Sequence, residues 1–422
     1  MTDVPINPQL SARSRIRRRD FIRMSGLVGM MALAAACAPA AAPSPEPKAA
    51  PKQEVPPTAV AAPKQETAPA SKAPAQAASA TAEWDKVVDG AQKEGKVAVT
   101  TLAGDGYRKI LDKFQATYPG VEVEHKSVAS ASFLAPPVLQ EQAGGVFSYD
   151  VALLSPGGPI MGSMMPAGAF DDIRPAIIHP DARDDKGWIG GFENCFMDKA
   201  KQKVFGVTWD QNLTLFYNSD LVKEKPKSIK DLADPQWKGK LTFMEYQTGF
   251  TYIVAVNMNH HMKDEAAEYI KKLFVDQQPV FVREGRQATE ALIRGQTAFA
   301  TGPTPPIIEQ FAAEGLGKNV QPVDVPEVRS INMYGVLLYI KAPHPNAAKL
   351  LINWLLSKDG GLAVTEHMKF NSRRADVPAV TPSVYPGLDY EKARREFLFA
   401  NVEEALPLQQ QAIEQLKALI VA

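Results

Sequence analysis

The chain has 422 residues, with 47 basic and 47 acidic side chains and a formal net charge of zero. Residues 1–36 hold six arginines and two aspartates, so the remainder carries a net charge of about −4. A mildly acidic body lacks the basic surface that nucleic acid requires, and we expect no nucleic-acid partner.

The N-terminal residues have the pattern of a bacterial export signal. Basic residues in 17–23 precede an apolar run over 24–36 and then Cys37. The Arg-Arg-x-Phe-Ile order at 18–22 resembles a twin-arginine signal, and 33–37 resembles a lipobox that would place a lipid on Cys37. A membrane-spanning helix is the alternative, but about 13 apolar residues are fewer than the ~20 that a bilayer needs. We predict a signal peptide over 1–36 and a lipid anchor.

Residues 37–82 consist almost entirely of Ala, Pro, Lys, Gln, Glu, Ser and Thr. Such a composition buries too little apolar surface to offset the entropy of ordering, so we predict a disordered tether. With Cys37 lipidated, Cys195 has no disulfide partner, and we expect it to be a small buried hydrophobic residue.

The folded body is expected to start at Glu83 and to alternate strands with helices. Apolar spacing predicts helices and β-branched runs predict strands. In chain order we expect a helix over 83–95, a strand over 97–102, a helix over 107–118, a strand over 121–125, a helix over 133–143 interrupted at Pro136-Pro137, and a strand over 150–154. This alternation indicates an α/β sheet.

The second half continues the alternation. We expect a long strand over 204–218, helices over 264–274 and 289–294, strands over 297–301 and 335–340, and a buried helix over 346–356.

Four stretches in this order resemble one known family. They are 93–100, 114–123, 216–240 with its Trp-Lys-Gly-Lys ending, and 344–360 beginning His-Pro-Asn-Ala-Ala-Lys. The chain resembles extracellular solute-binding lipoproteins of ABC importers, of the iron/polyamine/thiamine-like group with a type II periplasmic-binding fold. The resemblance implies an α/β fold of two lobes joined by two hinge strands, with the ligand held in the cleft between the lobes.

The domain boundaries carried over from that family cover nearly the whole body. Lobe one would comprise 83–205 and 332–422, lobe two 218–321, and the hinge strands 206–217 and 322–331. The resemblance also implies a membrane permease as partner and a position in the cell envelope, on its periplasmic or extracellular face. We expect a monomer.

Ligands of open α/β sheets bind at the carboxyl ends of strands, near helix N-termini. The expected ligand-binding residues are at strand ends and on the first hinge strand: Gly104, Asp105, Ser155, Trp209, Asp210, Tyr246, Thr248, Thr301 and Tyr334. Trp209 beside Asp210 suggests an aromatic wall with a carboxylate. Arg373 and Arg374 are expected at the surface.

The ligand class stays open between a polyamine or other organic amine, which would use carboxylates and aromatic faces, and an organic anion. Iron is disfavoured, because ferric-binding relatives use adjacent tyrosines where this chain has Thr301-Gly302-Pro303, and it has no Tyr-Tyr pair. His260-His261 is expected to be a solvated helix end, so we predict neither a metal site nor a cofactor.

An enzyme is the competing class. The chain has no Gly-x-Ser-x-Gly, His-Glu-x-x-His, P-loop or Cys-x-x-Cys motif, so we expect no catalytic residues, although a dispersed Ser-His-Asp triad of a lipid-anchored hydrolase stays an alternative. A lipoprotein that senses its ligand without transporting it is the other alternative.

Overall fold

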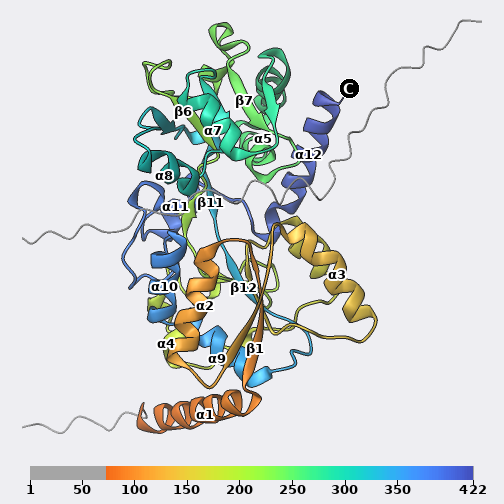
Figure 1. Cartoon of the computed structure of the whole chain (residues 1–422), viewed down its shortest axis with the longest axis vertical. Helices are drawn as coiled ribbons and strands as arrows, with labels where there is room; N and C mark the ends of the chain where they lie inside the picture. The colour runs from red at the N-terminus through yellow and green to blue at the C-terminus, as the bar shows by residue number, and fades with distance from the viewer. Residues whose placement is uncertain (1–72, 422) are drawn as a thin grey trace, which may run out of the picture. The chain divides into compact units, whose positions relative to one another are not determined.

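The computed structural model describes residues 73–421 (Figure 1). The predicted signal peptide, the lipidated Cys37 and most of the predicted tether lie outside the described residues. Helix α1 (Ala73–Glu94) starts earlier than the expected Glu83. Residues 73–82 are rich in alanine, the strongest helix former, and Pro74 lies in the first turn, where a missing N–H costs little. Helix α1 therefore extends into the stretch that was predicted as tether.

The first sheet has the strand order β2-β1-β3-β12-β4. β1 runs parallel to β2 and β3, and β12 runs antiparallel to β3 and β4. The strands are β1 (Lys96–Leu102), β2 (Glu122–Val128), β3 (Val151–Leu154), β4 (Phe205–Gly206) and β12 (Gly335–Leu338). Parallel strands need crossover connections, and the helices that cover the sheet supply them.

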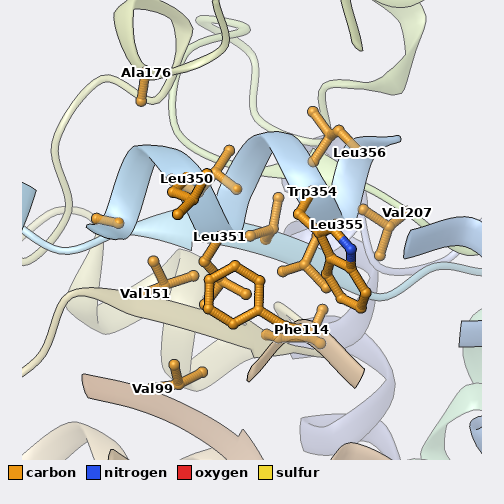
Figure 2. Packing of buried hydrophobic residues seen from close by; sticks show 14 of the residues in the cluster. Val99, Phe114, Val151, Ala176, Val207, Leu350, Leu351, Trp354, Leu355 and Leu356 are labelled. Carbon is orange, nitrogen blue, oxygen red and sulfur yellow. The ribbon is translucent and has the colours of Figure 1, made fainter. Parts of the chain in front are cut away.

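Helices cover both faces of this sheet: α2 (Asp105–Thr117), α3 (Ala131–Ala143), α4 (Pro180–Arg183), α9 (Pro345–Leu356), α10 (Lys358–Met368) and α11 (Tyr390–Glu396). Figure 2 shows α9 in the core, where Phe114 and Trp354 meet edge to face with their ring centroids 5.6 Å apart. The prediction of a buried helix here is confirmed. Helix α3 runs through Pro136 and Pro137, so the predicted interruption was wrong.

The second sheet has the order β10-β6-β9-β7-β8. Its strands are β6 (Leu215–Asn218), β7 (Leu241–Met244), β8 (Val280–Val282), β9 (Phe299–Thr301) and β10 (Val320–Pro322). Alternate residues of β6 pack into two clusters, Leu215 and Tyr217 on one face and Phe216 on the other. The surrounding helices are α5 (Gly249–Met262), α6 (Ala266–Lys271), α7 (Gly285–Ile293) and α8 (Pro305–Ala313).

A third, three-stranded sheet connects the two cores. It has the order β13-β11-β5, from β5 (Asp210–Gln211), β11 (Ser330–Asn332) and β13 (Leu398–Phe399). Phe399 packs with the first sheet's cluster and Leu398 with the second sheet's cluster. The predicted single strand over 204–218 is thus three strands, because this segment joins each sheet in turn.

The last helix, α12 (Leu406–Ile420), differs from the predicted assignment to lobe one. Its buried Ala412 and Leu416 belong to the second sheet's cluster, and Asn259 of α5 donates a hydrogen bond to Gln415 over 3.0 Å. The chain reaches that helix from β13, which already contributes Leu398 to the same cluster. The sequence pattern shows an amphipathic helix but not the surface that it covers.

Candidate functional site

The loop after β1 leads directly into α2 and contains two predicted site residues. Gly104 precedes the helix and Asp105 is its first residue, and both are exposed. Gly104 has φ +148° and ψ 136°, a conformation that favours glycine. Asp105 places a negative charge beside the positive end of the helix dipole, where it is stabilising.

Ser155 follows β3 and is held by a residue that the sequence analysis missed. Asn401 donates from Nδ2 to the Ser155 hydroxyl over 3.2 Å, to Asn332 Oδ1 over 2.8 Å and to the Met333 carbonyl over 2.7 Å. Asn401 Oδ1 accepts from the Met333 amide over 3.2 Å. One buried amide therefore ties the end of β3 to the segment between β11 and β12.

The segment that contains Asp210 pairs with β12 through β4 and then with β11 through β5, and the register changes between the two pairings. Gly206 pairs with Gly335 but Asp210 pairs with Asn332, so the first segment has one more residue between these pairs than the second. Extra residues of this kind bend a strand and change the direction of its side chains, and they are common beside binding sites. This irregularity brings Asp210 next to Asn332 of the Asn401 network.

Asp210 is 5% exposed, and only one of its two carboxyl oxygens has hydrogen-bond partners among the described residues. Its Oδ1 accepts from the Asn371 amide over 3.1 Å and from Asn371 Nδ2 over 2.9 Å. Its Oδ2 is buried and has no hydrogen-bond partner within residues 73–421. Burial raises the pKa of Asp210 to about 7, because it penalises the charged form more than the Asn371 hydrogen bonds favour it.

Tyr334 lies close enough to Asp210 to feel its charge, and two further aromatic side chains pack beside Tyr334. Tyr334 stacks on Phe370 with ring centroids 4.8 Å apart and planes at 24°, and Tyr107 of α2 lies with its ring centroid 6.5 Å from that of Tyr334. Burial, and then the nearby Asp210, raise the pKa of Tyr334 to about 12. Burial also raises the pKa of Tyr107, so both phenols are neutral near pH 7. We call Asp210, Asn371, Tyr334, Phe370 and Tyr107 the Asp210 cluster.

Trp209 is fully buried rather than part of an open aromatic wall. Its Nε1 donates to the Gly387 carbonyl over 2.9 Å, and the Arg373 guanidinium lies 4.3 Å from its ring centroid. Arg373 and Arg374 are 0% and 2% exposed, so the prediction that they lie at the surface was wrong. Arg373 is held by the carbonyls of Ile189 and Asn194, which a sequence pattern does not reveal. In this conformation Trp209 offers no surface to a solute.

The second sheet brings the other predicted residues to its own strand ends. Thr301, the last residue of β9, is fully buried; its hydroxyl accepts from the Met244 amide over 2.9 Å and lies 3.1 Å from the Thr251 hydroxyl. Thr251 in turn donates to the Met244 carbonyl over 2.7 Å. Gly302 follows with φ +109°, close against Met244 and Gly285.

Tyr246 and Thr248 lie on the turn between β7 and α5, and both are half-buried. The Thr248 hydroxyl donates to the Glu245 carbonyl over 2.8 Å instead of capping the helix. Tyr246 packs against the second sheet's core, and Glu245 pairs with Arg283 over 2.9 Å. The N-terminus of α5 has no side-chain cap, so its first backbone N–H groups can donate to a ligand, whereas α8 begins with two prolines that lack an N–H.

The sequence analysis missed Tyr107, Phe370, Asn371 and Asn401. Asn371 meets Asp210 across 161 sequence positions and Asn401 meets Ser155 across 246, so no local pattern connects them. Tyr107 carried a signal, since it follows the Gly104-Asp105 turn, but its apolar helical spacing indicated a core residue, and it is 5% exposed. Cys195 is buried as expected, and burial raises its pKa to about 11.

Within residues 73–421, no group of three or more His, Cys, Asp and Glu side chains is arranged to hold a metal ion. His261 shares a hydrogen bond of 2.9 Å with the Arg329 carbonyl through Nε2, and burial lowers the pKa of His260 and His261. The two rings meet edge to face with centroids 4.7 Å apart.

Two surface hollows lie away from the predicted residues. One of about 500 Å³ is lined by Lys223, Lys225 and Trp237 among others, and one of about 810 Å³ by Lys113, Trp354 and Leu362 among others. Neither contains a predicted site residue. None of the described helices is both long enough and apolar enough to cross a membrane.

Residues 109–387 match the model of bacterial extracellular solute-binding proteins, and the chain belongs to this family. The predicted solute-binding function and export are thereby confirmed at the level of the family, whose members are binding proteins that act outside the cytoplasm. An uncharacterized protein of Haemophilus influenzae is 28% identical over 144 residues, which are 33% of this chain and 40% of that relative. The match thus spans less than half of that relative's length.

Solved structures share the fold at low sequence identity. Iron-bound HitA from Pseudomonas aeruginosa has a TM-score of 0.57 and 18% identity, covering 77% of this chain and 99% of its own. The spermidine/putrescine transporter substrate-binding protein PotD from Streptococcus pneumoniae has a TM-score of 0.59 and 14% identity, covering 77% of this chain and 99% of its own. AfuA from Actinobacillus pleuropneumoniae, with fructose-6-phosphate bound, has a TM-score of 0.55 and 17% identity, covering 78% of this chain and 99% of its own. The predicted α/β periplasmic-binding fold is confirmed.

Proposed function

We propose that this protein is the substrate-binding component of an ABC importer and delivers a small polar solute to a membrane permease. Its two lobes are built on the two five-stranded sheets, and the solute binds where the strand ends of both lobes meet. Closure around the solute is a shift between open and closed populations, driven by contacts that only the closed form makes. The protein has no catalytic role in this scheme.

One observation carries the proposal. The predicted binding residues of both sheets lie where ligands of open α/β sheets bind, at or just beyond the carboxyl ends of strands. Ser155 follows β3, Gly104 and Asp105 follow β1, Tyr246 and Thr248 follow β7, and Thr301 ends β9. The segments β5, β11 and β13, which run between the two cores, would form the hinge; Asp210 is the first residue of β5, and Tyr334 closely follows β11.

We keep the expected lobe boundaries in this proposal, apart from the last helix. Residues 83–205 and the chain from 332 to the start of β13 would form lobe one, and 218–321 together with α12 would form lobe two. The hinge comprises 206–217, 322–331 and the passage after β13, which enters α12 and adds a third connection. A third connection restricts the lobes to fewer relative motions than two strands do.

Attachment to the membrane would use the lipid on Cys37, after cleavage of a twin-arginine signal. Residues 37–72 would then be the tether, and a proline-rich chain extends by about 3.1 Å per residue. Mass spectrometry of the mature protein should find a lipidated N-terminal Cys37. Cys37→Ala should release the protein from membranes, and a mature N-terminus well after residue 37 would contradict the anchor.

The binding function is tested by thermal unfolding with a panel of amines, polyamines, carboxylates, phosphonates, thiamine and Fe(III). A ligand at 100 times its Kd stabilises the folded state by about 2.7 kcal/mol, which is readily measured. One solute class should raise the Tm and be recovered chemically unchanged. A panel without any stabilising solute, or a solute that is turned over, would contradict the proposal.

A further inference from the structure

We propose that the Asp210 cluster is a subsite for a cationic group that carries N–H donors, a primary ammonium or a guanidinium, on an organic solute. This inference rests on the proposed function and names the solute class that the same site takes. It assigns the charge-recognising role to Asp210 and the aromatic walls to Tyr334, Phe370 and Tyr107.

The first argument is the unequal treatment of the two carboxylate oxygens. Asn371 directs both its backbone and its side-chain N–H at Oδ1, at 3.1 and 2.9 Å, which fixes the orientation of the group. Oδ2 receives no donor from the described part of the chain, although it is buried. A buried acceptor without a partner is costly, so the missing donor is expected from a bound molecule.

The second argument is that the protein gives Asp210 no counter-ion. Among the ion pairs of residues 73–421, Asp210 has no basic partner. Arg373, two residues beyond Asn371, lies over the ring of Trp209 and donates to the carbonyls of Ile189 and Asn194 and to Met333 Sδ. Its donors are committed elsewhere, so a cation for Asp210 must come from outside.

The third argument is the chemistry of the surrounding side chains. Tyr334, Phe370 and Tyr107 pack together as one aromatic group, and Tyr334 lies near Asp210. Aromatic rings attract cations. Both phenols are neutral near pH 7, since burial raises their pKa values. An anionic group would meet the Asp210 carboxylate there, which no basic side chain of the described residues neutralises.

A proton is the competing occupant of Oδ2. Without a cation, the raised pKa of Asp210 keeps a proton on the group over much of the range below pH 7. A cation would displace this proton, because it stabilises the charged carboxylate. The affinity for an amine should therefore rise between pH 5 and pH 8, over which an alkyl ammonium keeps its own charge.

The test uses the full chain and three four-carbon probes that differ in charge: 1,4-diaminobutane, 1,4-butanediol and succinate. Isothermal titration should show binding of the diamine alone. Asp210→Asn keeps the shape of the side chain and the Oδ1 acceptor. It should lower the affinity for the diamine by about 10- to 100-fold, the loss expected for one charge-assisted hydrogen bond. Tetramethylammonium, which has no N–H, should bind more weakly than the diamine.

Asp376→Asn is the matched control, since Asp376 is already paired with Arg374 over 2.8 Å. It should leave the diamine affinity unchanged. If Asp210→Asn does not fold, the rise in wild-type affinity from pH 5 to pH 8 tests the same charge, and a flat profile overturns the inference.

Two other results separate this inference from the proposed function. Succinate or the diol binding as well as the diamine, with Asp210→Asn unaffected, would leave a solute receptor but remove the cation subsite. No binding of any amine, while an anion from the wider panel stabilises the protein, would have the same meaning. If no solute in either panel stabilises the protein, both the cation subsite and the proposed solute-binding function are contradicted.

Discussion

The second five-stranded sheet and the three-stranded sheet differ in how their strand ends satisfy their polar groups. At the end of β9, the hydroxyls of Thr301 and Thr251 and the backbone of Met244 form a closed set of hydrogen bonds. At the start of β5 in the three-stranded sheet, Asp210 keeps one buried oxygen without a donor in the described chain. The edge of the second sheet is complete by itself, whereas Asp210 lacks one hydrogen-bond donor until it binds a proton or a ligand.

This difference separates stability from recognition. Changes at the edge of the second sheet should lower the free energy of unfolding with little effect on the choice of solute. Changes at the Asp210 cluster should alter the charge of the solute that is accepted. Trp209 tests the distinction within one segment, because it precedes Asp210 directly but is fully buried in the core.

Trp209→Ala should have the largest effect on stability, a loss of about 3–5 kcal/mol, because it removes a fully buried ring and the surface on which Arg373 stacks. Chemical denaturation measures the loss. Trp237→Ala, at a half-buried tryptophan on the edge of the second core, is the control and should cost less. A loss below about 1 kcal/mol at Trp209 would show that it is not a core residue.

The pH dependence of stability should reveal Asp210 in the absence of solute. Its pKa is about 7 in the fold and near 3.8 in the unfolded chain, so the folded state binds the proton more tightly. Stability from this group is complete below about pH 4 and is lost as the pH rises through 7, by up to about 4 kcal/mol. The difference between wild type and Asp210→Asn isolates this slope. A difference that does not vary between pH 4 and 8 would contradict the buried, unpaired carboxyl group.

Thr301→Val should lower stability by about 1–3 kcal/mol, since it leaves the Met244 amide without its acceptor and Thr251 without its neighbour. Thr117→Val is the control, because that hydroxyl only donates to the Lys113 carbonyl on an exposed helix. The affinity for the best solute should change little in Thr301→Val relative to Asp210→Asn. The reverse order would move recognition to the edge of the second sheet.

Thr248→Val should have the smallest effect, below about 1 kcal/mol, because its half-buried hydroxyl makes a single hydrogen bond to the Glu245 carbonyl. Equilibrium unfolding beside Thr301→Val provides the measurement. An equal loss of unfolding free energy in Thr248→Val and Thr301→Val would contradict the expectation that the more buried hydroxyl contributes more.

Much of the fold could be predicted from the sequence. Apolar spacing located α2 and α9, and β-branched runs located β1 and β3, because local periodicity reflects the face that each element buries. The strand ends then followed, and with them Ser155 and Thr301. The division of 204–218 into β4, β5 and β6 could not be predicted, since it depends on which sheet each part joins.

The surroundings of individual side chains could not be predicted from the sequence, for a similar reason. Trp209 and Asp210 are adjacent, and their sequence context suggested that both face a ligand. Trp209 is instead fully buried, and one carboxyl oxygen of Asp210 lacks a hydrogen-bond donor among the described residues. The burial of Arg373, the placement of Asn371 and the packing of α12 on α5 all arise from segments that return after more than a hundred residues. Long-range returns of this kind leave no periodic signal.

Hydrogen–deuterium exchange of the full chain with and without 1,4-diaminobutane tests the central claim most directly. The account predicts slower exchange at the strand ends of both sheets, in 102–107, 155–158 and 332–334 of the first and 244–251 and 301–304 of the second. Slowing confined to one sheet, or centred on the hollow lined by Lys223 and Trp237, would contradict a solute held between two lobes.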